Sequence, residues 1–308
     1  LPLVRDSWKR WLEERKRLEA SHSRAWDASQ NQMVQIDAAM GILKLNKNLL
    51  YATGASIYAQ PTKGSSQALN KFLDSQWTKE ETQAHLEKRV LYADFGVGSG
   101  TFLTTLAVHR SQDMLGIEYD QQRVLIALNN QLAWKAHDTR DIKFEPNIAL
   151  VAKNLMAVSN LGIPPHYKVL VLYLGDEAYD NALMMHLANL LQGVAIPVIL
   201  VSDKAGRHKY YRGFWEEYGF NELGKVRWSK EGGKNEKGSF FIFRRAARCR
   251  TFYQEPTAQP GDPEIARALK LCCMGASPAS RMAYLHELKS EIESGQYPSE
   301  LLGTAVKA

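Results

Sequence analysis

The stretch VLYADFGVGSG, residues 90–100, decides the fold, and the residues that follow it support the same interpretation. Val90–Phe95 is a short apolar run of strand type, and glycines follow it at positions 96, 98 and 100. Residues 101–108 (TFLTTLAV) can form a helix with an apolar face, and Met114–Glu118 (MLGIE) reads as a second short strand that ends on a carboxylate. The pattern therefore predicts a strand, a glycine loop, a helix and a strand in succession.

Each part of this unit has the chemistry of a nucleotide-binding site. Glycines let the backbone turn through angles closed to other residues and let a ligand approach closely. The N-terminus of the next helix offers free N–H groups to a polar ligand. A carboxylate about twenty residues beyond the loop, here Glu118, suits the hydroxyl pair of a ribose. The alternative is a tight turn between strand and helix that a chance acid follows.

The spacing of the glycines narrows the choice of nucleotide. The loop has the form G-x-G-x-G with Asp94 two residues before the first glycine, whereas dinucleotide folds carry G-x-G-x-x-G. It resembles motif I of the class I S-adenosylmethionine (SAM) methyltransferases. A nicotinamide or flavin enzyme is the alternative for this stretch alone, and a P-loop is excluded because no G-K-[ST] follows the glycines.

This resemblance implies a Rossmann-like α/β fold with a mostly parallel sheet, and SAM as the cofactor. It implies that the loop lies against the methionine part of SAM and that Glu118 holds the ribose hydroxyls. The loop residues that the resemblance assigns to the cofactor are Asp94, Gly96, Gly98, Gly100 and Thr101.

Strands and helices continue to alternate after the glycine loop, which predicts βαβ units and a parallel sheet. A last pair of strands reads as an antiparallel hairpin at the edge of the sheet, as in class I methyltransferases. The predicted strands are 148–151, 168–174, 197–202, 225–228 and 238–243, and the predicted helices include 67–76, 121–138, 181–191, 264–274 and 278–293.

Polar residues follow several predicted strands, and parallel sheets bind ligands outside the carboxyl ends of their strands. Besides Asp94 and Glu118, these residues are Asn154 and the pair Asp176–Glu177. In methyltransferases the position of Asn154 often faces the adenine amine, and Leu155 would cover the adenine face. A helix N-cap is the equal alternative for Asn154.

The order of several short motifs is similar to that of a narrower family, the non-SET histone lysine methyltransferases (the "disruptor of telomeric silencing" family). The motifs are IYAQPT at 57–62, DFGVGSG at 94–100, GIEYD at 116–120, KNL at 153–155 and GDEAY at 175–179. The resemblance implies Tyr58, Asp176 and Tyr179 as catalytic residues, and Gln60 and Thr62 as further cofactor residues. It also implies a lysine on the nucleosome as the methyl acceptor.

The chain departs from that family at three places. Ala59-Gln60 replaces Gly-Glu, and the loop reads GVGSG where the family has GSGVG. Gly175-Asp176-Glu177-Ala178-Tyr179 stands where the family has Asn-Asn-Phe-x-Phe, so Asp176 takes the place of the second Asn.

Composition sets the limits for partners and compartment. The chain has 308 residues, 45% of them hydrophobic, and a formal net charge of +6, which favours an acidic partner. The basic stretches 204–212 and 244–250 are candidates for nucleic-acid contact, with a solvated surface as the alternative. Three cysteines, at 249, 272 and 273, fit no zinc or disulfide pattern, and we expect reduced thiols and no metal. We expect no membrane segment, because no stretch approaches eighteen apolar residues.

The sequence thus predicts an N-terminal helical extension at 1–50, a methyltransferase domain at 51–250, and a linker with C-terminal helices at 251–308. The favoured function is a SAM-dependent histone lysine methyltransferase that acts on nucleosomes in the nucleus, with the cytoplasm as the other compartment. An RNA methyltransferase of the same fold is one alternative. A catalytically silent SAM-fold subunit that acts through binding is another.

Overall fold

The computed structural model describes most of the chain from residue 63 onward. The described residues are 63–98, 100, 103, 106, 112–136, 147–174, 181–203, 208–229, 237–245 and 260–297. The predicted helical extension at 1–50 lies outside them, and so does most of the predicted linker.

One sheet of seven strands organises the described residues, in the order β3-β2-β1-β4-β5-β7-β6. The first five strands pair in parallel, whereas β7 runs antiparallel to both β5 and β6. This order is that of the class I methyltransferase fold, so the predicted Rossmann-like, mostly parallel sheet is confirmed. The strands are β1 (Val90–Phe95), β2 (Asp113–Glu118), β3 (Asn147–Ala152), β4 (Val169–Leu174), β5 (Val198–Asp203), β6 (Phe220–Ser229) and β7 (Lys237–Arg245).

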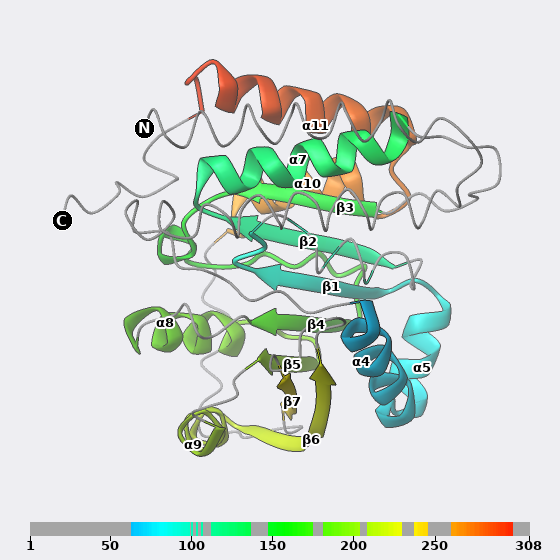
Figure 1. The fold of residues 1–308 in the computed structure, drawn as a ribbon, viewed down its shortest axis with the longest axis vertical. Helices are drawn as coiled ribbons and strands as arrows, with labels where there is room; N and C mark the ends of the chain where they lie inside the picture. Colours follow the sequence, from blue (N-terminus) through cyan, green and yellow to red (C-terminus); the bar gives the residue numbers. More distant parts are fainter. Residues whose placement is uncertain are drawn as a thin grey trace.

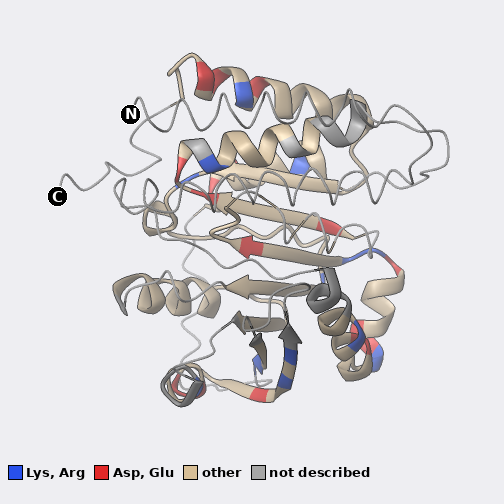
Figure 2. Ribbon diagram, in the orientation of Figure 1, with Lys and Arg blue, Asp and Glu red and all other residues tan. Residues whose placement is uncertain are grey.

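The central strands are hydrophobic on both faces because both faces are covered. Every residue of β1, β2 and β4 is buried, which is the pattern of parallel strands between two layers of helices. These strands are mostly tan in Figure 2, and charged residues are more frequent on the outer helices and on β6. The carboxyl ends of β1, β2 and β4 point to the same side, toward α8 (Figure 1).

Helices cover the faces and both edges of the sheet. The C-terminal helices α10 and α11 lie with α7 at the β3 edge, while α4 and α9 contact β6 at the opposite edge (Figure 1). The helices are α4 (Lys63–Gln76), α5 (Lys79–Leu86), α7 (Gln121–Ala136), α8 (Asn181–Gln192), α9 (His208–Glu217), α10 (Pro263–Cys272) and α11 (Pro278–Glu293), with a short 3₁₀ turn η1 (Leu155–Ala157).

Helix α5 is a feature that the sequence pattern did not predict. Its start is a capping box in which Glu81 N–H donates to Thr78 Oγ1 at 3.2 Å and Thr78 N–H donates to Glu81 Oε2 at 2.8 Å. The same carboxylate accepts from Arg244 of β7 at 2.7 Å, so the cap also ties the helix to the sheet.

The C-terminal helices cover the β3 edge of the sheet. An edge strand exposes unpaired backbone groups, which proteins cover or block. Here the hydroxyl of Tyr284 donates to the carbonyl of Leu150, and that of Tyr297 donates to the carbonyl of Ala152, both at 2.7 Å. Apolar side chains of α10 and α11 belong to the same core as the central strands.

A buried polar cluster fixes the amino end of β2. The carboxylate of Asp113 accepts from the Tyr167 hydroxyl at 2.9 Å, from Met274 N–H at 2.8 Å and from the Asn147 amide at 2.9 Å. Cys272 and Cys273 lie free and buried nearby, and burial raises the pKa of the Cys272 thiol to about 12. Both thiols are therefore structural rather than reactive.

No helix within the described part of the chain combines the length and the apolar run that crossing a membrane requires.

Candidate functional site

The glycine loop after β1 is held against the end of β2. Its three glycines have φ angles of +80°, +57° and +78° at positions 96, 98 and 100, in the left-handed region that other residues rarely adopt. The N–H groups of Gly96 and Val97 both donate to the carbonyl of Ile117, at 2.8 and 3.1 Å. Gly100 lies against α7, where an added Cβ would be 3.2 Å from the Cβ of Ala127. The sequence needs glycine here for both backbone angle and space.

The carboxylate of Glu118 is a backbone acceptor as well as a candidate ribose ligand. Its Oε2 accepts from Gly98 N–H at 2.9 Å, and its Oε1 accepts from the N–H groups of Tyr119 and Asp120 at 3.0 Å each. Burial raises the pKa of Glu118, and Arg123 together with the backbone N–H groups opposes that shift. A carboxylate has about four acceptor positions, so these three bonds leave one on Oε2.

Asp94 is the most unusual group of the site. It lies near the carboxyl end of β1, completely buried, and among the described residues neither of its oxygens has a hydrogen-bond partner. Burial, and secondly repulsion by Glu118, raise the pKa of Asp94 well above its ordinary value. A buried carboxyl without a partner is costly and needs an explanation. A cationic ligand is one such explanation, because it would place a positive charge beside the Asp94 carboxylate.

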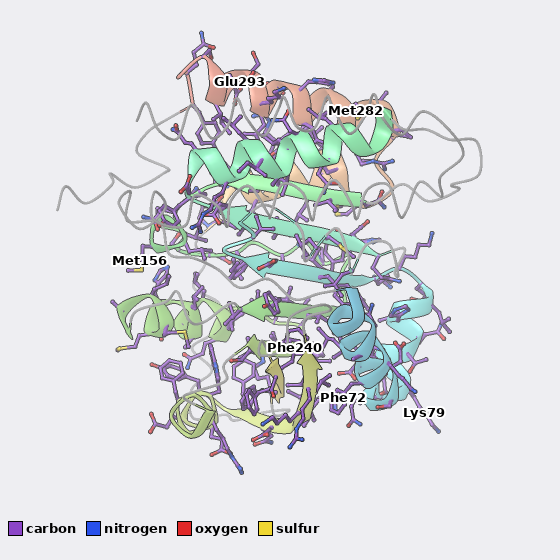
Figure 3. All side chains as sticks on the ribbon, viewed as in Figure 1. Phe72, Lys79, Met156, Phe240, Met282 and Glu293 are labelled. Carbon is purple, nitrogen blue, oxygen red and sulfur yellow. The ribbon has the colours of Figure 1, made fainter. Side chains whose placement is uncertain are left out.

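The segment after β3 forms the next part of the site. Asn154 is the N-cap of η1 and accepts from Met156 N–H at 3.0 Å, so the N-cap role considered from the sequence is observed. The side chain of Leu155 is buried at 7% exposure. Met156 is 49% exposed instead and lies at the outer margin of this end of the sheet (Figure 3).

Tyr119 and Met156 are candidate ligand contacts that the sequence pattern did not single out. Tyr119 follows Glu118 directly and is 48% exposed. Strands β2 and β3 pair in parallel with Glu118 opposite Ala152, so the residues after them leave the sheet side by side. For Tyr119 the available signal was a large aromatic residue directly after the polar strand end at Glu118, where a small polar turn residue is usual.

The structure brings together the predicted residues of the first three strand ends. Asp94 directly precedes the glycine loop, and Glu118 accepts from the N–H of Gly98 in that loop. The N–H of Lys153 donates to the backbone carbonyl of Glu118 at 2.8 Å, which places the segment that begins at Asn154 beside them. The other predicted site residues lie outside the described residues and stay predictions. They are Tyr58, Gln60, Thr62, Thr101, Asp176 and Tyr179.

The basic stretches are only partly described, and their described arginines have internal partners. Arg244 donates to the carbonyl of Gln76 at 2.7 Å as well as to Glu81. Arg245 donates to the carbonyls that end α8, including Leu191 at 2.7 Å. Arg212 of α9 pairs with Glu216 at 2.8 Å. Arg244 and Arg245 therefore hold elements of the fold together, whereas the pair of Arg212 with Glu216 lies on the surface.

The described part of the site combines two buried carboxyl groups, a glycine loop and two exposed apolar side chains. No group of three or more His, Cys, Asp or Glu side chains within the described ranges is arranged to hold a metal ion. The arrangement can bind a ligand that carries a cation, hydroxyl groups and a flat apolar surface.

No protein-family model matches the chain, and no curated protein matches it. Among solved structures, magnesium protoporphyrin IX methyltransferase from Synechocystis PCC 6803 with bound SAM is 13% identical, with a TM-score of 0.43, over 73% of this chain and 100% of that one. A SAM-dependent methyltransferase from Leishmania major is 10% identical, with a TM-score of 0.42, over 59% and 72%. Ribosomal protein L11 methylase from Lactobacillus delbrueckii subsp. bulgaricus is 15% identical, with a TM-score of 0.34, over 55% and 80%. Similarity at this level says nothing about what the chain binds or acts on.

Proposed function

We propose that the chain is a SAM-dependent methyltransferase, and the observation that carries this proposal is the buried carboxyl of Asp94, which lies beside Glu118 and has no hydrogen-bond partner within the described part of the chain. SAM combines an α-ammonium and a sulfonium with a ribose and an adenine. Asp94 would pair with the ammonium, and Glu118 would accept from a ribose hydroxyl. Tyr119 and Met156 would contact the adenine, with Asn154 at its edge.

Electrostatics favour this cofactor over the dinucleotide that the sequence pattern also allowed. A nicotinamide or flavin dinucleotide brings a pyrophosphate to the glycine loop, where the helix N-terminus would hold it. Here a second buried carboxyl, that of Asp94, lies beside Glu118 at that loop. Carboxylates in this position repel a pyrophosphate and attract a cation. The donor set therefore fits SAM.

The chain's own contribution to the reaction would be position and orientation. When bound, SAM would supply a methyl group that a nucleophile takes by in-line displacement at carbon, as the carbon–sulfur bond breaks and S-adenosylhomocysteine leaves. The loop of residues 96–100 and Glu118 would fix the cofactor, because their contacts already join β1 to β2. Holding two reactants in line replaces an encounter in solution and can contribute several kcal/mol.

The acceptor that we favour is a lysine of a nucleosomal histone. The order of the sequence motifs supports it, and so does the formal net charge of +6. In this proposal the protein works in the nucleus, and basic surface helps it to meet an acidic or nucleic-acid partner. A free lysine amine has a pKa of about 10.4, so the active site must also accept its proton. Tyr58, Asp176 and Tyr179 are the proposed catalytic residues.

The direct test is transfer of labelled methyl from SAM, with recombinant nucleosomes, free core histones and bulk RNA offered separately. We expect label on a histone, and its loss in Asp94→Asn and in Gly98→Arg, which would fill the loop. Glu216→Gln, on the exposed face of α9, is the matched control and should keep activity.

Three other results would change the proposal. Label on RNA alone would move the acceptor to RNA and keep the cofactor. Binding of SAM without transfer to any of the three would point to a silent binding subunit or to a methyl acceptor outside these three. Failure of the wild-type protein to bind SAM in calorimetry would overturn the cofactor assignment itself.

A further inference from the structure

We propose that the start of helix α10 is part of the cofactor site, and that Lys153 and Asp262 are positioning residues for segment 154–158. This inference rests on the proposed function, because that segment is the proposed adenine side of the site. The three contacts described next hold the segment at its start, middle and end.

The first contact holds the start of the segment. Lys153 directly precedes Asn154 and is only 5% exposed. Its ammonium lies 2.5 Å from Asp262 Oδ2 and 2.7 Å from Glu264 Oε2. Burial by itself would lower the pKa of Lys153, but the hydrogen bonds to these two carboxylates outweigh burial and raise it. The side chain is therefore a buried cation that the first turn of α10 neutralises.

The second contact holds the chain just beyond η1. The N–H of Asp262 donates to the carbonyl of Asn160 at 2.9 Å. Next to this bond the backbones of Gly162 and Gly261 cross so closely that a Cβ built on either glycine would lie 2.5 Å from the Cα of the other. One residue, Asp262, thus anchors both sides of the segment, through its carboxylate and through its N–H.

The third contact comes from α8, on the other flank. The Nε2 of His186 lies 2.9 Å from the carbonyl of Leu155 and 2.9 Å from that of Val158. A 3₁₀ turn of three residues has poor internal hydrogen-bond geometry and gains little stability by itself. The outside contacts therefore add to the Asn154 cap and to the two backbone bonds within the turn in fixing its conformation.

The location of the buried ion pair favours a positioning role over a general contribution to stability. Buried ion pairs often stabilise no better than apolar residues of similar volume, and their best-attested use is to specify one arrangement. The ion pair of Lys153 connects α10 to the residue between β3 and segment 154–158, the proposed adenine side of the site. Lys153 also donates its N–H to the Glu118 carbonyl, so the arrangement extends to the ribose side.

The test compares four single variants with the wild-type protein. Lys153→Met removes the cation, and Asp262→Asn removes one negative charge while an oxygen for the α10 N-cap remains. Lys153→Arg keeps the charge. Glu287→Gln is the control, because it breaks an exposed ion pair that α10 makes elsewhere, the 2.7 Å contact of Arg267 with Glu287 of α11.

Two readouts separate positioning from stability. Amide hydrogen exchange at Met156, Ala157 and Val158 in the ligand-free protein reports the order of η1. Affinity for S-adenosylhomocysteine, by calorimetry, reports the site. In Lys153→Met and Asp262→Asn we expect about tenfold faster exchange and about tenfold weaker binding. Lys153→Arg should recover most of both, and Glu287→Gln should change neither.

Failure of this proposal is distinguishable from failure of the proposed function. Variants with a lower melting temperature but wild-type exchange at the three amides would overturn the positioning role. If the wild-type protein binds no S-adenosylhomocysteine, the proposed function fails, and the exchange data alone decide the positioning role. If Lys153→Met does not fold, the exchange rates and the binding affinity of Asp262→Asn decide the positioning role instead.

Discussion

The N–H of Gly98 donates to Oε2 of Glu118 at 2.9 Å, across twenty residues of sequence. The bond joins the middle of the glycine loop to the carboxyl end of β2. Because Oε1 of the same carboxylate holds the N–H groups of Tyr119 and Asp120, one acidic side chain orders both strand ends of the site. Glu118 therefore shapes the loop as well as offering an acceptor to a ligand.

Replacing Glu118 by Gln should damage both roles. An amide has one acceptor oxygen, so its NH₂ must face one of the backbone N–H groups that the carboxylate now accepts. We expect at least tenfold weaker binding of S-adenosylhomocysteine in calorimetry, and a loss of about 1–3 kcal/mol in the free energy of unfolding from urea denaturation. Glu216→Gln serves as the exposed control. Affinity within twofold of wild type would show that Glu118 does not hold the ligand.

Asp94→Asn should stabilise the ligand-free protein while it weakens SAM binding. The folded-state pKa of Asp94 is raised by burial and by Glu118. A carboxyl with a raised folded-state pKa contributes stability below its unfolded pKa of about 3.9, and this contribution is lost as pH rises through the folded pKa. Wild-type stability should therefore fall as pH rises from about 4. Asp94→Asn should lose the part of this pH dependence that Asp94 contributes, while the part from Glu118 remains. Its free energy of unfolding should be larger than that of the wild type at pH 7.

Proton release offers a second test of Asp94. If the carboxyl is protonated in the free protein and ionised beside an ammonium, SAM binding must release a proton. The binding enthalpy should then depend on the ionisation enthalpy of the buffer in wild type and much less in Asp94→Asn. Identical buffer dependence in the two proteins would show that Asp94 does not lose a proton when the cofactor binds.

Two glycine substitutions should have opposite effects on stability. A Cβ at Gly116 of β2 would lie 2.9 Å from Leu150, 3.0 Å from Val97 and 3.1 Å from Leu103, so Gly116→Ala should cost about 1–3 kcal/mol and displace the glycine loop. A Cβ at Gly213 in helix α9 would meet no atom within 4 Å, so Gly213→Ala should gain about 0.5–1 kcal/mol. Urea denaturation of both variants checks the signs, and a neutral Gly116→Ala would refute the packing argument.

The two tyrosine hydroxyls at the β3 edge should each stabilise the fold. Tyr284→Phe and Tyr297→Phe leave the carbonyls of Leu150 and Ala152 without those donors, and we expect each to cost about 1 kcal/mol or more. Tyr218→Phe, near the opposite edge of the sheet, is the control. Thermal melting of the three variants would contradict this account if all three shifted equally.

The sequence predicted the sheet well because its strands are continuous apolar runs. Val90–Phe95 was predicted with the bounds that the structure shows, and the predicted edge hairpin is confirmed by pairing of Trp228 with Gly238. Strand β6 begins earlier than predicted, at Phe220, because Asn221 and Glu222 interrupt the apolar run and a bulge lies between Glu222 and Gly224. Helix α5 was missed because it is short and polar (KEETQAHL), with no apolar periodicity to detect.

The part of the candidate site that lies within one short stretch of sequence was predictable. Asp94, the glycines and Glu118 lie in one stretch whose order carries the signal. The partners of Lys153 could not be predicted, since Glu264 is 111 residues away and each charged residue alone reads as ordinary surface. The burial of Asp94 without a hydrogen-bond partner among the described residues was equally unpredictable, because only packing shows that the carboxyl is buried.

The crossing of Gly162 and Gly261 bears on the order in which the protein matures during synthesis. Chains grow from the N-terminus, so β3 and Lys153 leave the ribosome long before the helices that cover and neutralise them. Until then the β3 edge has no tyrosine donors and segment 154–158 has no anchor from α10. We therefore expect the nascent chain to depend on chaperones at this stage, and to become able to bind its ligand only after residues 260–297 have docked.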